Sequence, residues 1–290
     1  VDRTFNLDIK LSTKILNFFL ELDPDQDYFL HFEVIPDRLP AELKKLIELF
    51  KPGVLQFEVG IQTLDKIVSD RIGRRQNKQR ALENLSYLRH QTNAHLHTDL
   101  IIGLPGATLE IFKADLNQLI NIGLQEVQVG ILKNLKGTPL TQHIDPFHMI
   151  FESYAPYEIQ SNKDLNRELL AELRVFHKFW DKYYNSGNFK LSMVALFNYS
   201  NPFDEFRLLS RYTYEKLERD YSISLDKLAQ NLLEYFMEEK NISFAHAREL
   251  ILKDILIKQD RKIPQVLRDY DLGVPKVKIC SSQKSLKRQT

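Results

Sequence analysis

Cysteine is almost absent from this chain: a single one, Cys280, stands in 290 residues. One thiol excludes an intramolecular disulfide and a zinc site made of cysteines alone. It also excludes a self-contained iron–sulfur cluster, which needs several thiolates. A chain without disulfides fits a reducing, cytoplasmic compartment.

An excess of charge is lacking as well, because 40 basic residues balance 39 acidic ones. This balance removes the usual electrostatic argument for a nucleic acid or an anionic membrane as partner. No apolar run reaches the roughly 20 residues that span a bilayer, and the first residues lack the apolar core of a signal peptide. The chain has no initiating methionine, which fits either a piece of a longer polypeptide or a trimmed sequence. The composition is otherwise that of a globular protein with one large or two medium domains.

The first 140 residues alternate between the periodicities of strands and of helices. Strand patterns occupy residues 28–35, 54–61, 94–103 and 126–132. Helical patterns lie between them, with Asp8 and Thr108 as capping residues, Pro40 near one start and Gly123 just past one end. Such alternation with short loops predicts parallel strands, in either an open doubly wound sheet or a β/α barrel.

Each of the four expected strands has one apolar face and one polar face. Successive side chains of a strand point to opposite faces, and the polar residues in step are His31 and Glu33; Gln56, Glu58, Gly60 and Gln62; His95, His97 and Asp99; and Glu126, Gln128 and Gly130. A fully covered parallel sheet is apolar on both faces. The pattern therefore favours a barrel or partial barrel with a polar, ligand-holding interior over an open sheet with one solvated face.

The character of the chain changes after about residue 150. Long amphipathic helices are expected at 162–184, after Ser224 and after Ser243, and residues 189–198 fit a strand. We therefore divide the chain into an α/β part at 1–150, a mainly helical part at 151–272 and a basic tail at 273–290. The tail is expected to be disordered, since a solvated end is more common than a docking segment.

Two clusters have both a functional and a structural interpretation. His95 and His97 share one strand face and would form a metal triad with Asp99, but both histidines precede the acid and lie deeper in the sheet, which favours hydrogen-bonded histidines and no metal. The arginines Arg71, Arg74 and Arg75 are either a solvated face or include one that turns back to bind a carboxylate or phosphate.

The motifs together resemble a known family. Phe-Glu-Val-Gly-Ile-Gln at 57–62, Arg74 twelve residues later and Asp-Leu-Ile-Ile-Gly-Leu-Pro-Gly at 99–106 resemble the radical S-adenosylmethionine (SAM) core of the coproporphyrinogen-oxidase-like and methylthiotransferase-like class. Residues 2–6 and 33–36 resemble a loop and an acid motif of the same core. Residues 131–138 and 154–157 resemble the subgroup with an N-terminal cobalamin-binding domain and an uncharacterised helical C-terminal domain.

The resemblance implies a fold and a chemistry. The fold would be a partial (β/α)₆ barrel of parallel strands, here without its first strand, followed by the helical region. The intact enzyme would use SAM, a [4Fe–4S] cluster and, in this subgroup, cobalamin, and would cleave SAM reductively to a 5′-deoxyadenosyl radical that attacks a small-molecule substrate. Substrate and reaction type stay open.

The resemblance also implies roles for seven residues. Glu33 would contact the amino group of SAM, Arg74 its carboxylate, and Gln62 and Asp99 the ribose hydroxyls. The backbone at Ile101, Gly103 and Gly130 would contact the adenine. This agrees with the strand parity, because Glu33, Gln62 and Asp99 all belong to the polar face near the strand ends.

One departure from the family is large. The Cys-x₃-Cys-x₂-Cys loop that binds the cluster is not in this chain, so the chain is expected to be the C-terminal portion of the enzyme and inactive by itself. A non-catalytic interaction fragment and a metal-dependent β/α-barrel hydrolase that uses His95, His97 and Asp99 are the alternatives.

Overall fold

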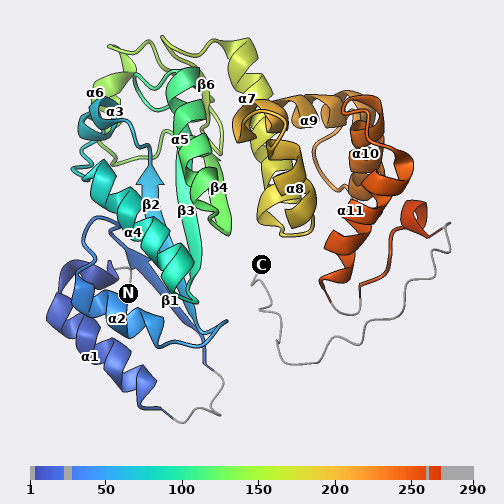
Figure 1. Cartoon of the computed structure of the whole chain (residues 1–290). Coiled ribbons are helices and arrows are strands. Elements are labelled where there is room, and N and C mark those ends of the chain that lie inside the picture. The colour runs from blue at the N-terminus through green and yellow to red at the C-terminus, as the bar shows by residue number, and fades with distance from the viewer. Residues whose placement is uncertain (1–3, 23–27, 259–260, 269–290) are drawn as a thin grey trace.

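The computed structural model describes residues 4–22, 28–258 and 261–268 of the chain (Figure 1). Cys280, the basic tail at 273–290 and the first two residues of the 2–6 motif lie outside the described residues. Within the described ranges, no helix is long and apolar enough to cross a membrane.

A four-stranded parallel sheet forms the centre of the N-terminal half. Its strands are β1 (Leu30–Val34), β2 (Leu55–Gln62), β3 (His95–Ile102) and β4 (Glu126–Ile131), and they lie side by side in the order of the sequence. A doubly wound sheet reverses its strand order at a switch point, and this sheet does not. The expected α/β fold with parallel strands and a helical C-terminal region is confirmed.

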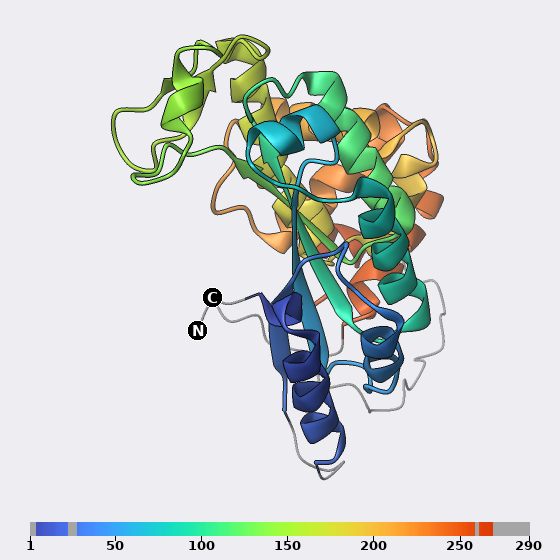
Figure 2. The same ribbon diagram turned by 90° about the vertical axis from the view of Figure 1, so that its left-hand side faces the viewer.

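Helices cover one face of the sheet (Figure 2). The buried, apolar residues of the strands alternate with the polar residues, which lie on the opposite face. The covering helices are α1 (Ile9–Leu20), α2 (Ala41–Glu48), α4 (Lys78–Gln91) and α5 (Leu109–Ile122). Buried leucines such as Leu43, Leu85 and Leu116 pack with Phe57 and Leu96 of the strands in one core. The alternation read from the sequence therefore assigns the faces correctly.

Short-range signals set most helix ends. Asp8 accepts a hydrogen bond from Leu11 N, and Thr108 accepts one from Ile111 N, as N-caps do. Gly123 ends α5 at a left-handed φ of 80°, where a glycine costs least. The short helix α3 (Lys66–Arg71) follows β2 and begins at its N-cap Asp65.

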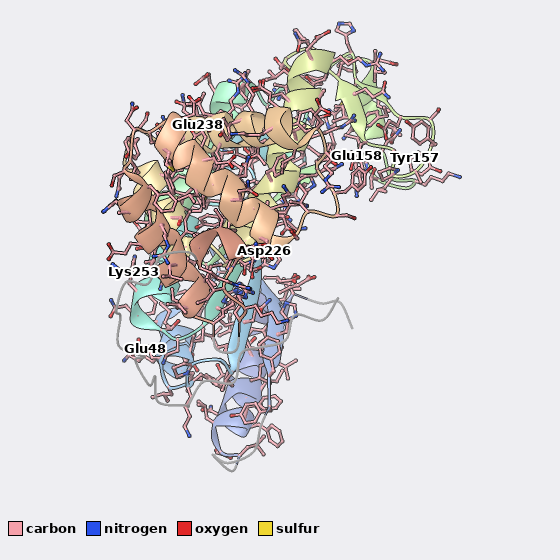
Figure 3. All side chains as sticks on the ribbon, turned by 90° about the vertical axis from the view of Figure 1, so that its right-hand side faces the viewer. Glu48, Tyr157, Glu158, Asp226, Glu238 and Lys253 are labelled. Atoms are coloured by element: carbon pink, nitrogen blue, oxygen red, sulfur yellow. The ribbon has the colours of Figure 1, made fainter. Side chains whose placement is uncertain are left out.

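A small lobe follows β4 and projects over the C-terminal ends of the strands. It contains α6 (Thr141–Ile144) and an antiparallel pair, β5 (Ile150–Phe151) and β6 (Ile159–Ser161). Tyr157 lies on its outer part (Figure 3), whereas Glu158 Oε2 lies 3.5 Å from Nε of Arg174 in the helix that follows the lobe. Arg174 of the following helix connects the lobe to that helix, because its Nη2 donates a hydrogen bond to Ile159 O at 2.6 Å.

The C-terminal half is a helical bundle with an aromatic core. Its helices are α7 (Arg167–Trp180) with the π-helical turn η2 (Asp181–Asn185), α8 (Lys190–Phe197), α9 (Pro202–Leu217), α10 (Leu225–Glu238) and α11 (Phe244–Leu256). Ser224 and Ser243 cap α10 and α11 as expected. The rings of Phe176, Trp180 and Phe206 are in contact inside it.

Two local predictions in this half are wrong. Residues 189–198 form the helix α8 and no strand, because Asp254 of α11 accepts hydrogen bonds from Leu191 N and Ser192 N and so caps a helix start that has no local cap. The helix predicted from residue 162 begins at Arg167. Asn162 instead closes a turn, accepting from Asp164 N and Leu165 N.

The outer edge of β4 is closed by side chains of α7 and η2. Trp180 Nε1 donates to Val127 O at 2.7 Å, and Val127 N donates to Asn185 Oδ1 at 3.1 Å. Tyr184 OH donates to Leu124 O at 2.7 Å. These contacts occupy the positions where a further strand would bond, so the bundle is an integral end of the sheet.

Candidate SAM-binding site

The polar face of the sheet contains a cavity of about 270 Å³. Three residues expected from the sequence, Glu33, Arg74 and Asp99, line it together. They come from β1, from the loop after α3 and from β3, which are far apart in the chain. The parallel strands bring them together, since equivalent positions of such strands lie in rows across the sheet.

Arg74 is a half-buried cation in this cavity. Its Nη1 donates to Gly60 O, and Gln76 Nε2 donates to the same oxygen at 2.8 Å. Burial lowers the pKa of Arg74 below its ordinary value, and the charge of Asp99 partly offsets this effect. The guanidinium therefore bonds a neutral carbonyl while keeping further donors, which suits it to receive an anionic group.

Glycine at position 60 makes room for Arg74. A Cβ at Gly60 would lie 2.8 Å from Arg74 Nη2, closer than two such atoms approach. Asp99 pairs with Gly60 across the sheet, and Glu33 is exposed at the β1 side of the same face. The cavity lining therefore combines the guanidinium of Arg74 with three carboxylates, those of Glu33, Glu58 and Asp99.

Gln62 lies at a bulge that the sequence did not reveal. The register between β2 and β3 shifts between Gly60 and Gln62, and Gln62 has a φ of 61°. Asp99 Oδ1 accepts a hydrogen bond from Ile61 N at 2.7 Å, so one of its oxygens already holds the backbone. Gln62 is not among the residues that line the cavity.

The three residues expected at the adenine, Ile101, Gly103 and Gly130, also lie outside the cavity lining. Gly103 O accepts from Asn162 Nδ2 at 3.2 Å, and a Cβ at Gly103 would lie 2.7 Å from Ile159. The backbone of Gly103 is thus engaged by the projecting lobe. Ile101 packs against the small cluster around Leu104.

Of the three arginines, Arg71 also turns back towards the sheet. Its Nη1 donates to Pro105 O at 2.7 Å, and its guanidinium lies 4.7 Å from the ring centre of Phe147. Arg71 thus fixes the Gly-Leu-Pro-Gly turn to the lobe. Arg75 is exposed, as the solvated interpretation predicts.

The histidines of the polar face contact glutamates and a glutamine. His31 Nε2 lies 3.1 Å from Glu58 Oε1, and His95 Nε2 lies 3.5 Å from Glu126 Oε1. His97 Nε2 lies 3.1 Å from Gln128 Oε1. Within the part of the chain that the structure describes, no group of three or more histidine, cysteine or acidic residues is arranged to hold a metal.

The sequence did not assign several polar residues of this region to the SAM site, among them Glu58, Gln76, Gln128 and Asp115. Gln76 and Gln128 line the cavity, and both carried a signal, since Gln76 follows Arg74 by two residues and Gln128 is in step on the polar face. Asp115 lies behind the turn that follows β2. The sequence feature that could have indicated Asp115 is its place as a single acid on the apolar side of a predicted helix.

Two family models match the chain. The model of the radical SAM superfamily matches residues 2–119, which include the sheet through β3 and the cavity residues Glu33, Arg74 and Asp99. Residues 2–119 therefore belong to the radical SAM superfamily. A second model, described as a protein of unknown function (DUF4080), matches residues 145–288. The chain thus combines a radical SAM region with a mainly helical region that matches a family of unknown function.

A curated relative supports the superfamily. The oxygen-independent coproporphyrinogen III oxidase of Cereibacter sphaeroides (strain ATCC 17025 / ATH 2.4.3) is 24% identical over 208 residues. The match includes 72% of this chain and spans 41% of the length of that relative.

Two solved structures show a likeness over about half of the chain. Both are the radical SAM methyltransferase TsrM from Kitasatospora setae. One, with tryptophan substrate and a SAM analogue, is 18% identical at a TM-score of 0.42 and covers 48% of this chain and 28% of that chain. The other, with cobalamin and a [4Fe–4S] cluster bound, is 16% identical at a TM-score of 0.44. It covers 54% of this chain and 33% of that chain.

Proposed function

We propose that this chain provides the SAM-binding face of a radical SAM enzyme, within a partial (β/α)₆ barrel. The observation that carries the proposal is the cavity that Arg74, Glu33 and Asp99 line together. An amino acid needs a cation for its carboxylate and an anion for its ammonium group. A cavity with both, in a region of this superfamily, fits the methionine part of SAM.

Each side chain has a defined task in this proposal. Arg74 binds the carboxylate with donors that Gly60 O leaves available, and Glu33 accepts from the amino group. Asp99 accepts from a ribose hydroxyl with Oδ2, since Oδ1 holds Ile61 N. Gln62, Ile101, Gly103 and Gly130 belong to the same proposal at its ribose and adenine ends. When bound, SAM supplies the carbon–sulfur bond whose cleavage starts the reaction.

The residues of this chain fit SAM but not the cluster. A [4Fe–4S] cluster takes thiolate ligands, and the chain has one cysteine. In the proposed enzyme the cluster ligands therefore come from outside these 290 residues. Cobalamin enters through the subgroup resemblance and has no assigned residues here.

Arg74→Ala is expected to weaken SAM binding by about 10- to 100-fold, the effect of losing a charged hydrogen-bond partner. Asp99→Asn keeps an oxygen for Ile61 N and is expected to weaken binding by about tenfold through loss of charge alone. Isothermal titration of the purified chain with SAM measures both. Arg75→Ala, an exposed neighbour, is the control. Normal binding in both variants would refute the assignment.

Gly60→Ala tests the same site without removing a charge. The new Cβ displaces the guanidinium of Arg74, and SAM binding is expected to fall by about tenfold, roughly one charged hydrogen bond. The melting temperature should change little, because a long side chain moves more easily than backbone. Gln56→Ala, on the same face of β2, is the control. Equal losses of binding in both variants would count against a specific effect on Arg74.

A further inference from the structure

Asp115 is a buried acid that the proposed function does not use. It lies in α5 at 4% exposure, on the side of the helix that also carries Phe112 and Leu116. Its Oδ2 accepts hydrogen bonds from Thr63 Oγ1 at 2.6 Å and from Leu64 N at 2.9 Å. Burial raises the pKa of Asp115, and the two hydrogen bonds oppose this rise. A buried carboxyl is costly unless it is bonded, so its position calls for a role.

The segment that Asp115 holds is the strained end of β2. Gln62 has a positive φ, which is unfavourable for a residue with a side chain. Asp99 of β3 binds Ile61 N on one side of it, and Asp115 of α5 binds Thr63 and Leu64 on the other. Two carboxyl groups from neighbouring elements thus fix the bulge from both directions.

A continuous series of hydrogen bonds leads from this segment to Arg74. Thr63 Oγ1 accepts from Asp65 N at 3.1 Å, and Asp65 Oδ1 accepts from Val68 N at 2.9 Å, which starts α3. At the end of α3, Ser69 O accepts from Arg74 N at 2.8 Å. Ser69 Oγ donates to Arg74 O at 2.7 Å. The backbone of Arg74 is therefore bonded on both sides to a helix whose start depends on Thr63.

We propose that Asp115 is a positioning residue for the cavity: through Thr63 it fixes the turn after β2 and the start of α3, and thereby places Arg74 and Gln62. This inference rests on the proposed function for its ligand. Asp115 itself does not line the cavity, so its effect on a ligand is indirect.

The test compares Asp115→Ala with Asp115→Asn in the full chain. The asparagine keeps an oxygen that can accept from Thr63 and Leu64, whereas alanine removes both bonds. SAM affinity by isothermal titration is expected to fall about tenfold in Asp115→Ala and to stay within about threefold of wild type in Asp115→Asn. Glu110→Ala removes an exposed acid of the same helix and is the control.

Amide hydrogen exchange gives a second readout that needs no ligand. Exchange at residues 61–65 and 74 is expected to quicken in Asp115→Ala and to recover in Asp115→Asn. If wild type does not bind SAM, the proposed function fails, and exchange alone still decides the positioning role. Unchanged exchange in Asp115→Ala would overturn that role, as would wild-type SAM affinity in a chain that binds SAM.

A second pair of variants tests the same role if Asp115→Ala fails to fold. Thr63→Val removes the hydroxyl that links Asp115 to Asp65, and Thr63→Ser retains it. Faster exchange at residue 74 in the valine variant, with recovery in the serine variant, supports the role. Equal exchange in both variants and wild type would overturn it.

Discussion

Trp180→Ala is expected to lower the free energy of unfolding by about 4 kcal/mol, the usual range for truncating a buried tryptophan. Trp180 is fully buried, and its ring centre lies 5.6 Å from that of Phe176 and 4.5 Å from that of Tyr184. Its indole Nε1 also donates a hydrogen bond to Val127 O. Domains are stable by about 5–15 kcal/mol, so the loss is large. Urea unfolding followed by circular dichroism measures it.

Trp180→Phe separates packing from the edge contact. Phenylalanine keeps a ring in the stack but leaves Val127 O without its donor, and we expect a loss of about 1–3 kcal/mol. Tyr221→Ala, at a position that is 69% exposed, is the control and should stay within about 0.5 kcal/mol of wild type. A Trp180→Ala protein as stable as this control would show that the bundle does not support the sheet.

Asp254→Ala is expected to cost about 3 kcal/mol, because three donors lose their acceptor in a buried place. These donors are Leu191 N, Ser192 N and Ser192 Oγ, all within 2.8 Å of Asp254 oxygens. They form the start of α8, so thermal unfolding should show a melting temperature lower by about 6–12 °C. The control is Glu249→Ala, which removes an exposed acid of α11, the helix that also carries Asp254. It should change the free energy of unfolding by less than about 0.5 kcal/mol. An equal effect of both variants would refute the capping role.

The cost of Asp254→Ala should also depend on pH. Burial raises the pKa of Asp254 above its ordinary value of 3.8, so the folded chain keeps this proton to a higher pH than the unfolded chain does. The stability that this group contributes is therefore fully present below the ordinary pKa and decreases as pH rises through the raised pKa. Urea unfolding of the wild type and of Asp254→Ala, from acidic to neutral pH, should show that the difference between their free energies of unfolding becomes smaller as the pH rises. A difference that widens with pH would contradict this reasoning.

The faces of the sheet were predictable because each strand alternates strictly. Leu55, Phe57 and Val59 differ in polarity from Gln56 and Glu58, and a period of two leaves one way to bury the apolar set. The family resemblance then implied roles for Glu33, Arg74 and Asp99, which line one cavity together. Caps such as Thr108 act within three residues, so they too are readable from local sequence.

What escaped prediction depends on residues distant in the chain. The start of α8 is set by Asp254, more than sixty residues later. The carbonyl of Gly103 is taken by Asn162, which lies in a lobe with no periodic pattern. The bulge at Gln62 interrupts an alternation that reads as regular, because its cause is the side chains of Asp99 and Asp115 on other elements.

The two edges of the sheet have unequal capacity for association. Within the residues that the structure describes, β1 has one neighbouring strand, whereas α7 and η2 occupy the outer edge of β4. Strands added edge to edge build a fibril only if every subunit can be extended at both ends. If a second copy of the chain paired with β1, the outer edge of that copy would be its β4, which α7 and η2 already occupy. No third copy could then add, and the assembly would stop at a dimer. We therefore expect Trp180 and Asn185, which bond the outer edge of β4, to prevent edge-to-edge growth beyond two copies.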